Sequence, residues 1–276
     1  MNEESHIILI PWDFTPVAEC ALQHGFKFAE KAKSKKIVLI HIIKNEKEHD
    51  EALGKLNQVV SDNQGKHGLK IEAVVRVGSI FTTIGEVASE VEAELVVMGT
   101  HGLKGMQKLT GSWALKVIVN SKVPFVVIQE PPNETDMRDI VFPVDFKREN
   151  KEMLNWVSYL HKHFNPKFHI IKPNTTDLGF IKKIKANIAF SRKFMDSKSI
   201  DYEIHTAEGK KSFPLEIMEF GKSINADLIL ILSTKNIGIT DFVLGAQEQY
   251  VIANSSKIPV MVINPRDDLT KMDIVY

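Results

Sequence analysis

A glycine-rich stretch, GTHGLKGMQKLTGSWALKVI, runs from Gly99 to Ile118 and directly follows the aliphatic run LVVM. It carries four glycines in its first thirteen residues and then enters a helical pattern. Backbone N–H groups at a glycine-rich turn before a helix form a site for anions, and the helix dipole adds positive charge there. The chemistry that this pattern indicates is phosphate binding. The alternative is a tight turn that needs positive-φ residues and binds nothing.

A second group of polar and aromatic residues closes the earlier aliphatic runs. Pro11, Trp12 and Asp13 follow the run IILI, and His41 and Ile42 close the run IVLI. In open α/β sheets, ligands bind beyond the carboxyl ends of the strands, where the strand order reverses. We therefore expect these residues to converge with the glycine stretch on one crevice. Asp13 is also a helix-capping type, but Thr15-Pro16 is a better helix start and leaves Asp13 free.

The elements that position these residues alternate between strands and helices. The strands are continuous aliphatic runs, which are typical of a parallel sheet buried on both faces. Apolar residues between the runs recur at helical spacing, as in Val17, Ala21, Phe28 and Ala32. This alternation predicts an α/β fold with an open, doubly wound, Rossmann-like sheet.

The chain states this pattern twice. The segment HIILIPWDF near the start is similar to RDIVFPVDF downstream, and in this match Asp13 corresponds to Asp145. The segment GSWALKVIVNSKVPFVVIQ is likewise similar to GAQEQYVIANSSKIPVMVINP, and the matching segments follow one another in the same order in both halves. We predict two tandem domains, residues 1–132 and 137–276, joined near the polar linker PPNETD.

The second half lacks the glycine stretch. Ser233 stands at the position of Gly99 and Asn236 at that of Gly102, while Gly245 is followed by Ala246 instead of serine. Side chains at close-approach positions exclude a phosphate, so we expect a domain that binds no nucleotide. Its Lys- and Ile-rich segment, residues 172–199, is expected to cover the vacant crevice.

Composition excludes several classes of function. Lysine plus arginine equals aspartate plus glutamate, 35 each, which argues against a nucleic-acid binder. The single cysteine, Cys20, excludes a disulfide framework and is expected to be a buried thiol. The acidic N-terminus lacks the features of a signal peptide, and no apolar run is long enough to span a bilayer. We therefore expect a cytoplasmic protein without a membrane partner.

The motifs PxDF, HII and MGTHG…GSWALKVIVNSKVPFVVI resemble those of the universal stress protein family, and the whole chain resembles a tandem-domain member. The similarity covers essentially all of the first half and is recognisable but weaker over the second. It implies a sheet of five mainly parallel strands in each domain and pairing through the final strand. One branch of this family binds ATP at a Gly-x-x-Gly…Gly-Ser motif near an aspartate, and another branch does not bind nucleotide.

Carried over to this sequence, the resemblance implies a site for ATP or a related adenine nucleotide, with or without Mg²⁺, in the first domain. Asp13 would bind ribose hydroxyls or adenine, and Ile42 would face the base. The expected nucleotide-binding residues are Pro11, Trp12, Asp13, Ile42, Met98, Gly99, Gly102, Gly111, Ser112 and Trp113. Two departures are the loop of eight residues between Gly102 and Gly111, where nine are usual, and Trp12, where a small residue is commoner.

The function expected is that of a stress-response regulatory or sensor module and not of an enzyme. We find no catalytic residues: the sequence shows no general base, no Walker lysine and no paired acids, although slow ATP hydrolysis stays open. The scattered histidines have no metal-ligand spacing, so no metal site is expected. A ligand-free scaffold is the main alternative. An adenine-nucleotide α-hydrolase-type enzyme is disfavoured because its SGGxDS-like and HxGH motifs are absent.

The final strand of each half, VPFVVIQ and IPVMVIN, is apolar and terminal. An exposed apolar edge favours pairing, so we expect the two domains to pair through these strands about a pseudo-two-fold axis. A homodimer of chains is a further alternative that the sequence leaves open.

Overall fold

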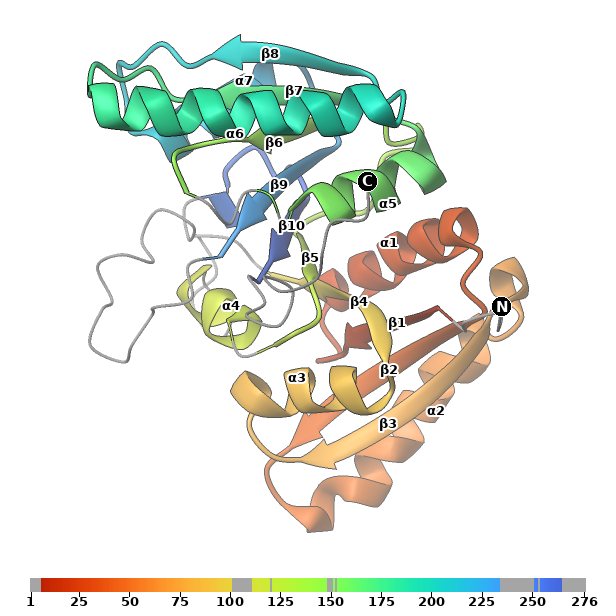
Figure 1. Cartoon of the computed structure of the whole chain (residues 1–276). Coiled ribbons are helices and arrows are strands. Elements are labelled where there is room, and N and C mark those ends of the chain that lie inside the picture. Colours follow the sequence, from red (N-terminus) through yellow and green to blue (C-terminus); the bar gives the residue numbers. More distant parts are fainter. Residues whose placement is uncertain are drawn as a thin grey trace. The chain divides into compact units, whose positions relative to one another are not determined.

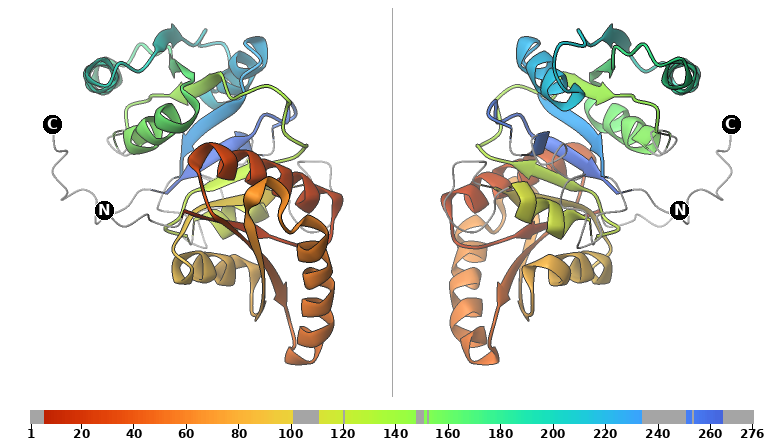
Figure 2. Two further views of the ribbon diagram at one scale, coloured as in Figure 1. Left: turned by 90° about the vertical axis from the view of Figure 1, so that its right-hand side faces the viewer. Right: turned by 90° about the vertical axis from the view of Figure 1, so that its left-hand side faces the viewer.

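The computed structural model describes residues 6–100, 111–119, 121–147, 151, 153–233, 251–252 and 254–264. The chain forms two compact units, residues 1–134 and 135–276 (Figure 1). Each unit has one parallel sheet with helices on both of its faces (Figures 1 and 2). The predicted α/β, doubly wound fold is confirmed.

The first unit is built on five parallel strands in the order β3-β2-β1-β4-β5. The strands are β1 (Ile7–Pro11), β2 (Lys36–Ile43), β3 (Lys70–Val77), β4 (Ala93–Gly99) and β5 (Phe125–Ile128). The helices are α1 (Pro16–Ala32), α2 (His49–Asn63), α3 (Ile80–Glu90) and α4 (Gly111–Ile118), with short 3₁₀ turns at Glu46–Glu48 and Lys66–Gly68. The chain order reverses between β1 and β4, so a cleft is expected where these two strands end.

The second unit repeats this topology, with the order β10-β9-β6-β7-β8 and all strands parallel. Its strands are β6 (Asp139–Pro143), β7 (Lys167–Lys172), β8 (Tyr202–Thr206), β9 (Leu228–Leu232) and β10 (Val260–Ile263). Its helices are α5 (Met153–Phe164), α6 (Leu178–Ser197) and α7 (Phe213–Ser223). The repeated strand order shows the duplication at the level of structure.

The cores follow from the aliphatic runs. Every residue of β9 is buried, and so are Ile7 to Ile10 of β1, as expected for strands covered on both faces. Local signals place the helix starts: α1 has proline in its first turn, and Ser79 and Asp177 cap α3 and α6 through their side chains.

Cys20, in α1, is half-buried, so the expectation of a buried thiol is wrong.

The hydrogen-bond register corrects one detail of the repeat. The amide of Thr100 donates to the carbonyl of Ile128 at 2.8 Å, and the amide of Ser233 donates to that of Ile263 at 2.9 Å. Ser233 therefore corresponds to Thr100, and Leu232 corresponds to Gly99. The alignment of Ser233 with Gly99 was wrong by one residue, because the aliphatic run LILIL offers no landmark by which to set the register.

Helix α6 lies against the loop that follows β6. The Asn187 side-chain amide donates to the carbonyls of Asp145 and Lys147, at 2.8 and 2.9 Å. Phe180 stacks on Phe146 with ring centroids 4.3 Å apart. The Lys- and Ile-rich segment is thus a helix held to this loop.

No helix within the described ranges is long and apolar enough to cross a bilayer.

His24 ties α1 to the segment that follows β5. Its Nε2 donates to the Glu130 carbonyl at 3.0 Å, and the side chain is buried. Burial lowers the pKa of His24 to about 4. The folded first unit therefore favours the neutral imidazole.

This pKa predicts an acid-sensitive first unit. An unfolded histidine titrates near pH ~6.5, so the stability contributed by neutral His24 is complete above that pH and falls as the pH drops towards ~4, by about 3 kcal/mol in total. His24→Gln keeps an N–H donor but does not titrate. In urea titrations of the full chain, we expect the variant to gain about 3 kcal/mol relative to wild type between pH ~7 and pH ~4. A difference that does not change with pH would contradict this role for His24.

Candidate functional site

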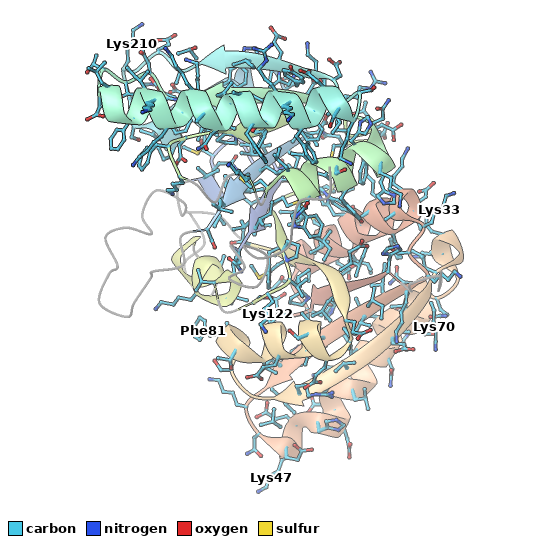
Figure 3. All side chains as sticks on the ribbon, in the orientation of Figure 1. Lys33, Lys47, Lys70, Phe81, Lys122 and Lys210 are labelled. Carbon is cyan, nitrogen blue, oxygen red and sulfur yellow. The ribbon has the colours of Figure 1, made fainter. Side chains whose placement is uncertain are left out.

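A cleft opens at the carboxyl end of the first sheet, where β1, β2 and β4 end. Figure 3 marks this end by Phe81, at the start of α3, and the opposite end by Lys70, at the start of β3. The cleft is lined by residues of β1, β2 and β4, of the turn after β1, and of α1, α3 and α4: Pro11, Trp12, Asp13, Val17, Ala18, Ile40, His41, Ile42, Ile80, Ile84, Met98, Gly99 and Val117. It lies at the reversal of strand order, as expected for an open α/β sheet.

The structure brings together six of the residues expected to bind nucleotide: Pro11, Trp12, Asp13, Ile42, Met98 and Gly99. Gly111, Ser112 and Trp113 form the first turn of α4, whose Val117 reaches the cleft. Gly102 lies outside the described residues, as do His101 and the loop up to residue 110.

Asp13 lies at the exposed rim of the cleft and shapes the turn into α1. Its Oδ1 accepts hydrogen bonds from the backbone amide of Thr15, at 3.1 Å, and from the Thr15 hydroxyl. The expectation that Thr15-Pro16 leaves Asp13 free of a turn is therefore wrong. Among the described residues Oδ2 has no hydrogen-bond partner, so this oxygen can accept from a ligand.

His41 lies in the cleft, as expected from its place among the residues that end the strands. Its Nδ1 donates to the Trp12 carbonyl at 2.6 Å, and the Phe14 ring packs edge-on at 4.9 Å between centroids. Because a carbonyl oxygen only accepts, Nδ1 must carry a proton. In the neutral ring Nε2 is then an acceptor. The signal available in the sequence was its place at the end of β2, beside Ile42.

Trp12 forms part of the wall. Its side chain is only 3% exposed, and its Nε1 is buried without a hydrogen-bond partner in the described part of the chain. A buried donor without a partner costs about 1–3 kcal/mol.

Gly99 is required by packing at the end of β4. A Cβ at this position would lie 2.6 Å from the carbonyl oxygen of Val17, in the first turn of α1. In the second unit Leu232 takes the corresponding place. Part of the glycine signal in the sequence therefore reflects helix packing.

The second unit has an equivalent cleft with different chemistry. It is lined by Pro143, Asp145, Lys147, Met153, Phe213, Pro214, Ile217, Ile231, Leu232 and Val251. The Asp145 Oδ1 accepts from the Lys147 amide at 2.8 Å, which repeats the turn at Asp13. The Lys147 ammonium lies 4.0 Å from Asp145 Oδ2, and no lysine occupies the matching position in the first unit, which is Thr15. The second cleft thus pairs its carboxylate with a cation and presents leucine where the first has glycine.

A comparison of the sequence with models of protein families also finds two repeats in this chain. The model of the universal stress protein family matches residues 4–129 and again residues 137–264. The chain belongs to the universal stress protein family. It is a member with two family domains in tandem, as the motifs predicted.

Sequence relatives include two universal stress proteins of Methanocaldococcus jannaschii. One is 35% identical over 88 residues, which cover 32% of this chain and 49% of that protein, so the match spans about half the length of this relative. The other is 25% identical over 153 residues, covering 44% of this chain and 93% of that protein. A crystal structure of a universal stress protein from Archaeoglobus fulgidus is similar over 96% of this chain and 98% of that one, with a TM-score of 0.75 and 19% identity. That likeness supports the fold.

The packing at Gly99 predicts opposite effects of two glycine substitutions. Gly99→Ala would force the new methyl group against Val17 and should destabilise the first unit by about 1–3 kcal/mol. Gly54→Ala, in α2, places its methyl group where nothing lies within 4 Å and should stabilise the helix by about 0.5–1 kcal/mol. Both can be read from urea unfolding of the full chain. Equal effects of the two substitutions would show that α1 does not press against Gly99.

Proposed function

We propose that the first unit binds ATP or a related adenine nucleotide in its cleft, and that the protein acts in the cytoplasm as a regulatory or sensor module of the stress response. The observation that carries the proposal is a mostly apolar cleft at the reversal of strand order with a carboxylate at its rim. Ile42, Ile84 and Val117 supply apolar wall, and Asp13 supplies the carboxylate. Ligand sites of this kind combine apolar walls with a few placed polar groups.

The polar groups suit the two parts of an adenosine. Oδ2 of Asp13, which has no hydrogen-bond partner among the described residues, can accept a hydrogen bond from a ribose hydroxyl. The Nδ1 of His41 bonds to the Trp12 carbonyl, so Nε2 is the ring nitrogen that can bond to a ligand. An adenine edge carries both an acceptor nitrogen and an amino donor, so it can pair with this nitrogen. The apolar side chains would contact the faces of the ring.

The phosphate end of the proposal rests on α4 and on the family resemblance. The first turn of α4, which begins at Gly111, has backbone N–H groups without helical partners, and these together with the helix dipole favour an anion. Gly102, the second glycine of the motif, lies outside the described residues. We propose that the nucleotide binds with or without Mg²⁺ and that the module responds to it without a reaction of its own.

The repeat supplies a matched pair of variants. Asp13→Ala and Asp145→Ala each remove a turn-forming carboxylate, but only the first lies in the proposed site. In calorimetric titrations with ATP, we expect Asp13→Ala to weaken binding by tenfold or more, since a hydrogen bond to a charged group contributes about 1.5–3 kcal/mol. Asp145→Ala should bind ATP as wild type does.

Asp13→Asn separates the effect on the turn from the effect on the ligand, because its side chain keeps an oxygen that can accept from the Thr15 amide. If Asp13→Asn folds as wild type and still loses affinity, the carboxylate acts on the ligand. Equal ATP affinity in wild type, Asp13→Ala and Asp145→Ala would place any nucleotide elsewhere. A wild-type protein that binds no ATP would favour the ligand-free scaffold, in which Gly99 serves packing alone.

A further inference from the structure

A cluster of titratable side chains lies on the second sheet, away from both clefts. Asp139 is the first residue of β6, His169 lies in β7, and Glu203 and His205 lie in β8. The register pairs His169 with Glu203, and Ile171 with His205. Asp139 and Glu203 lie near the amino ends of their strands and His205 lies further along β8, and none of the four residues lines either cleft. Figure 3 marks the carboxyl side of β8 by Lys210, in the segment that follows this strand.

The distances within the cluster fit a shared cation. His169 Nδ1 lies 3.2 Å from His205 Nε2, and His205 Nε2 lies 4.0 Å from Glu203 Oε2. One ligand atom from each of the three residues lies within 4.8 Å of the others. A tetrahedral zinc ion with Zn–N bonds of about 2.0–2.1 Å separates its ligand nitrogens by roughly 3.3 Å. The two imidazoles already have this spacing, and the Glu203 side chain, which is half exposed to solvent, needs only a small rotation to join them.

Asp139 orients the buried histidine. Its Oδ1 accepts a hydrogen bond from His169 Nε2 at 2.7 Å. A carboxylate accepts, so the His169 proton is held on Nε2 and the Nδ1 lone pair faces His205. A carboxylate behind a histidine in this way is the usual arrangement around protein-bound zinc, where it fixes the ring and raises its basicity.

The first unit shows that the fold does not need these residues. Strand register places Ile7, Val38 and Val74 at the positions that Asp139, His169 and His205 occupy in the second unit. The same sheet therefore accommodates aliphatic side chains at all three. Replacing buried aliphatic groups by polar ones costs free energy unless they gain partners.

One polar pair is common to both units. Lys36 and Glu72 form an ion pair in the first unit, and Lys167 and Glu203 form the matching pair at 2.8 Å in the second. This pair is thus part of the shared fold. The aspartate and the two histidines are the feature particular to the second unit.

The surroundings leave one side of the cluster open. His169 is buried, His205 is half-buried and Glu203 is exposed. The Phe220 ring, from α7, packs against His205 at 4.6 Å and His169 at 6.1 Å between centroids and forms an apolar wall. The Lys167 ammonium faces Glu203 from the solvent side and would share or release this carboxylate when a cation binds.

We propose that His169, His205 and Glu203 bind a zinc-type divalent metal ion, with Asp139 as the positioning residue for His169. Three protein ligands leave a fourth position for water. Because β8 is the outer strand of the described second sheet, the ion would tie it to β7 and stabilise this edge. The site is independent of nucleotide binding in the first unit.

The test uses the full chain, stripped with a chelator and titrated with ZnCl₂ by calorimetry, without nucleotide. We expect one Zn²⁺ per chain and a thermal midpoint of the second unit that rises with Zn²⁺. Co²⁺ should give the visible absorption bands of a tetrahedral site. His169→Val and His205→Val install the residues that the first unit carries, so the sheet should tolerate them, and each should weaken zinc binding at least 100-fold. Asp139→Asn should weaken binding by about 10–100-fold while the cobalt bands persist.

His49→Gln is the matched control, because it removes a histidine of the first unit that lies outside the cluster. It should leave zinc binding unchanged. Zinc binding that survives both valine substitutions, or that His49→Gln weakens equally, would assign the ion to other groups. A folded wild-type chain that binds no Zn²⁺ and gives no tetrahedral cobalt bands would overturn the proposal and leave the cluster as a hydrogen-bonded histidine pair. Glu203→Gln provides a second folded variant if either valine substitution fails to fold.

Discussion

The parallel pairing of strands within each unit is the constraint from which both candidate sites follow. When neighbouring strands run in the same direction, their carboxyl ends meet at one edge of the sheet and their amino ends at the other. In the first unit this brings Asp13, His41 and Gly99 to one cleft, although they lie at or just after the ends of three different strands. In the second unit the register sets His169 beside Glu203 and places His205 on the same face of β8. Side chains far apart along the chain are thus assembled by backbone hydrogen bonds.

The duplication allows one unit to be interpreted against the other. Both keep the strand order, the aspartate turn after the first strand and the lysine–glutamate pair between the second and third strands. They differ where chemistry is possible. The first cleft has Gly99 and an Asp13 oxygen that no described residue pairs with, and the second has Leu232 and the cation of Lys147. The polar cluster of the second sheet is replaced by aliphatic residues in the first. Among the described residues, the units therefore differ both in their clefts and in the polar cluster that only the second unit carries.

The fold and half of the first site could be predicted from the sequence. Continuous aliphatic runs between amphipathic segments specify a parallel α/β sheet, and the residues that end those runs form the cleft, as for Asp13 and Ile42. Gly99 was placed correctly, but its packing against Val17 depends on how closely α1 approaches the end of β4, which no local pattern reveals. Leu232 was missed because an unbroken aliphatic run does not show its register.

The histidine cluster was beyond the sequence for a related reason. Metal-site motifs are recognisable when the ligands are close together along the chain, as on one helix or one turn. His169 and His205 lie on separate strands, and only the register of β7 and β8 brings their nitrogens to 3.2 Å. The comparison of the two units could have given a hint, since two valines and an isoleucine are replaced by two histidines and an aspartate. That comparison needs the strand register, which only the structure supplies.

The most direct test of nucleotide binding is to purify the full chain under native conditions, denature it, and identify the released small molecules by mass spectrometry, with ATP calorimetry on the same preparation. We expect an adenine nucleotide at about one per chain, or an empty protein that takes up one ATP per chain. A protein that is purified without nucleotide and gives no heat with ATP would contradict the account and make the first cleft a feature of packing.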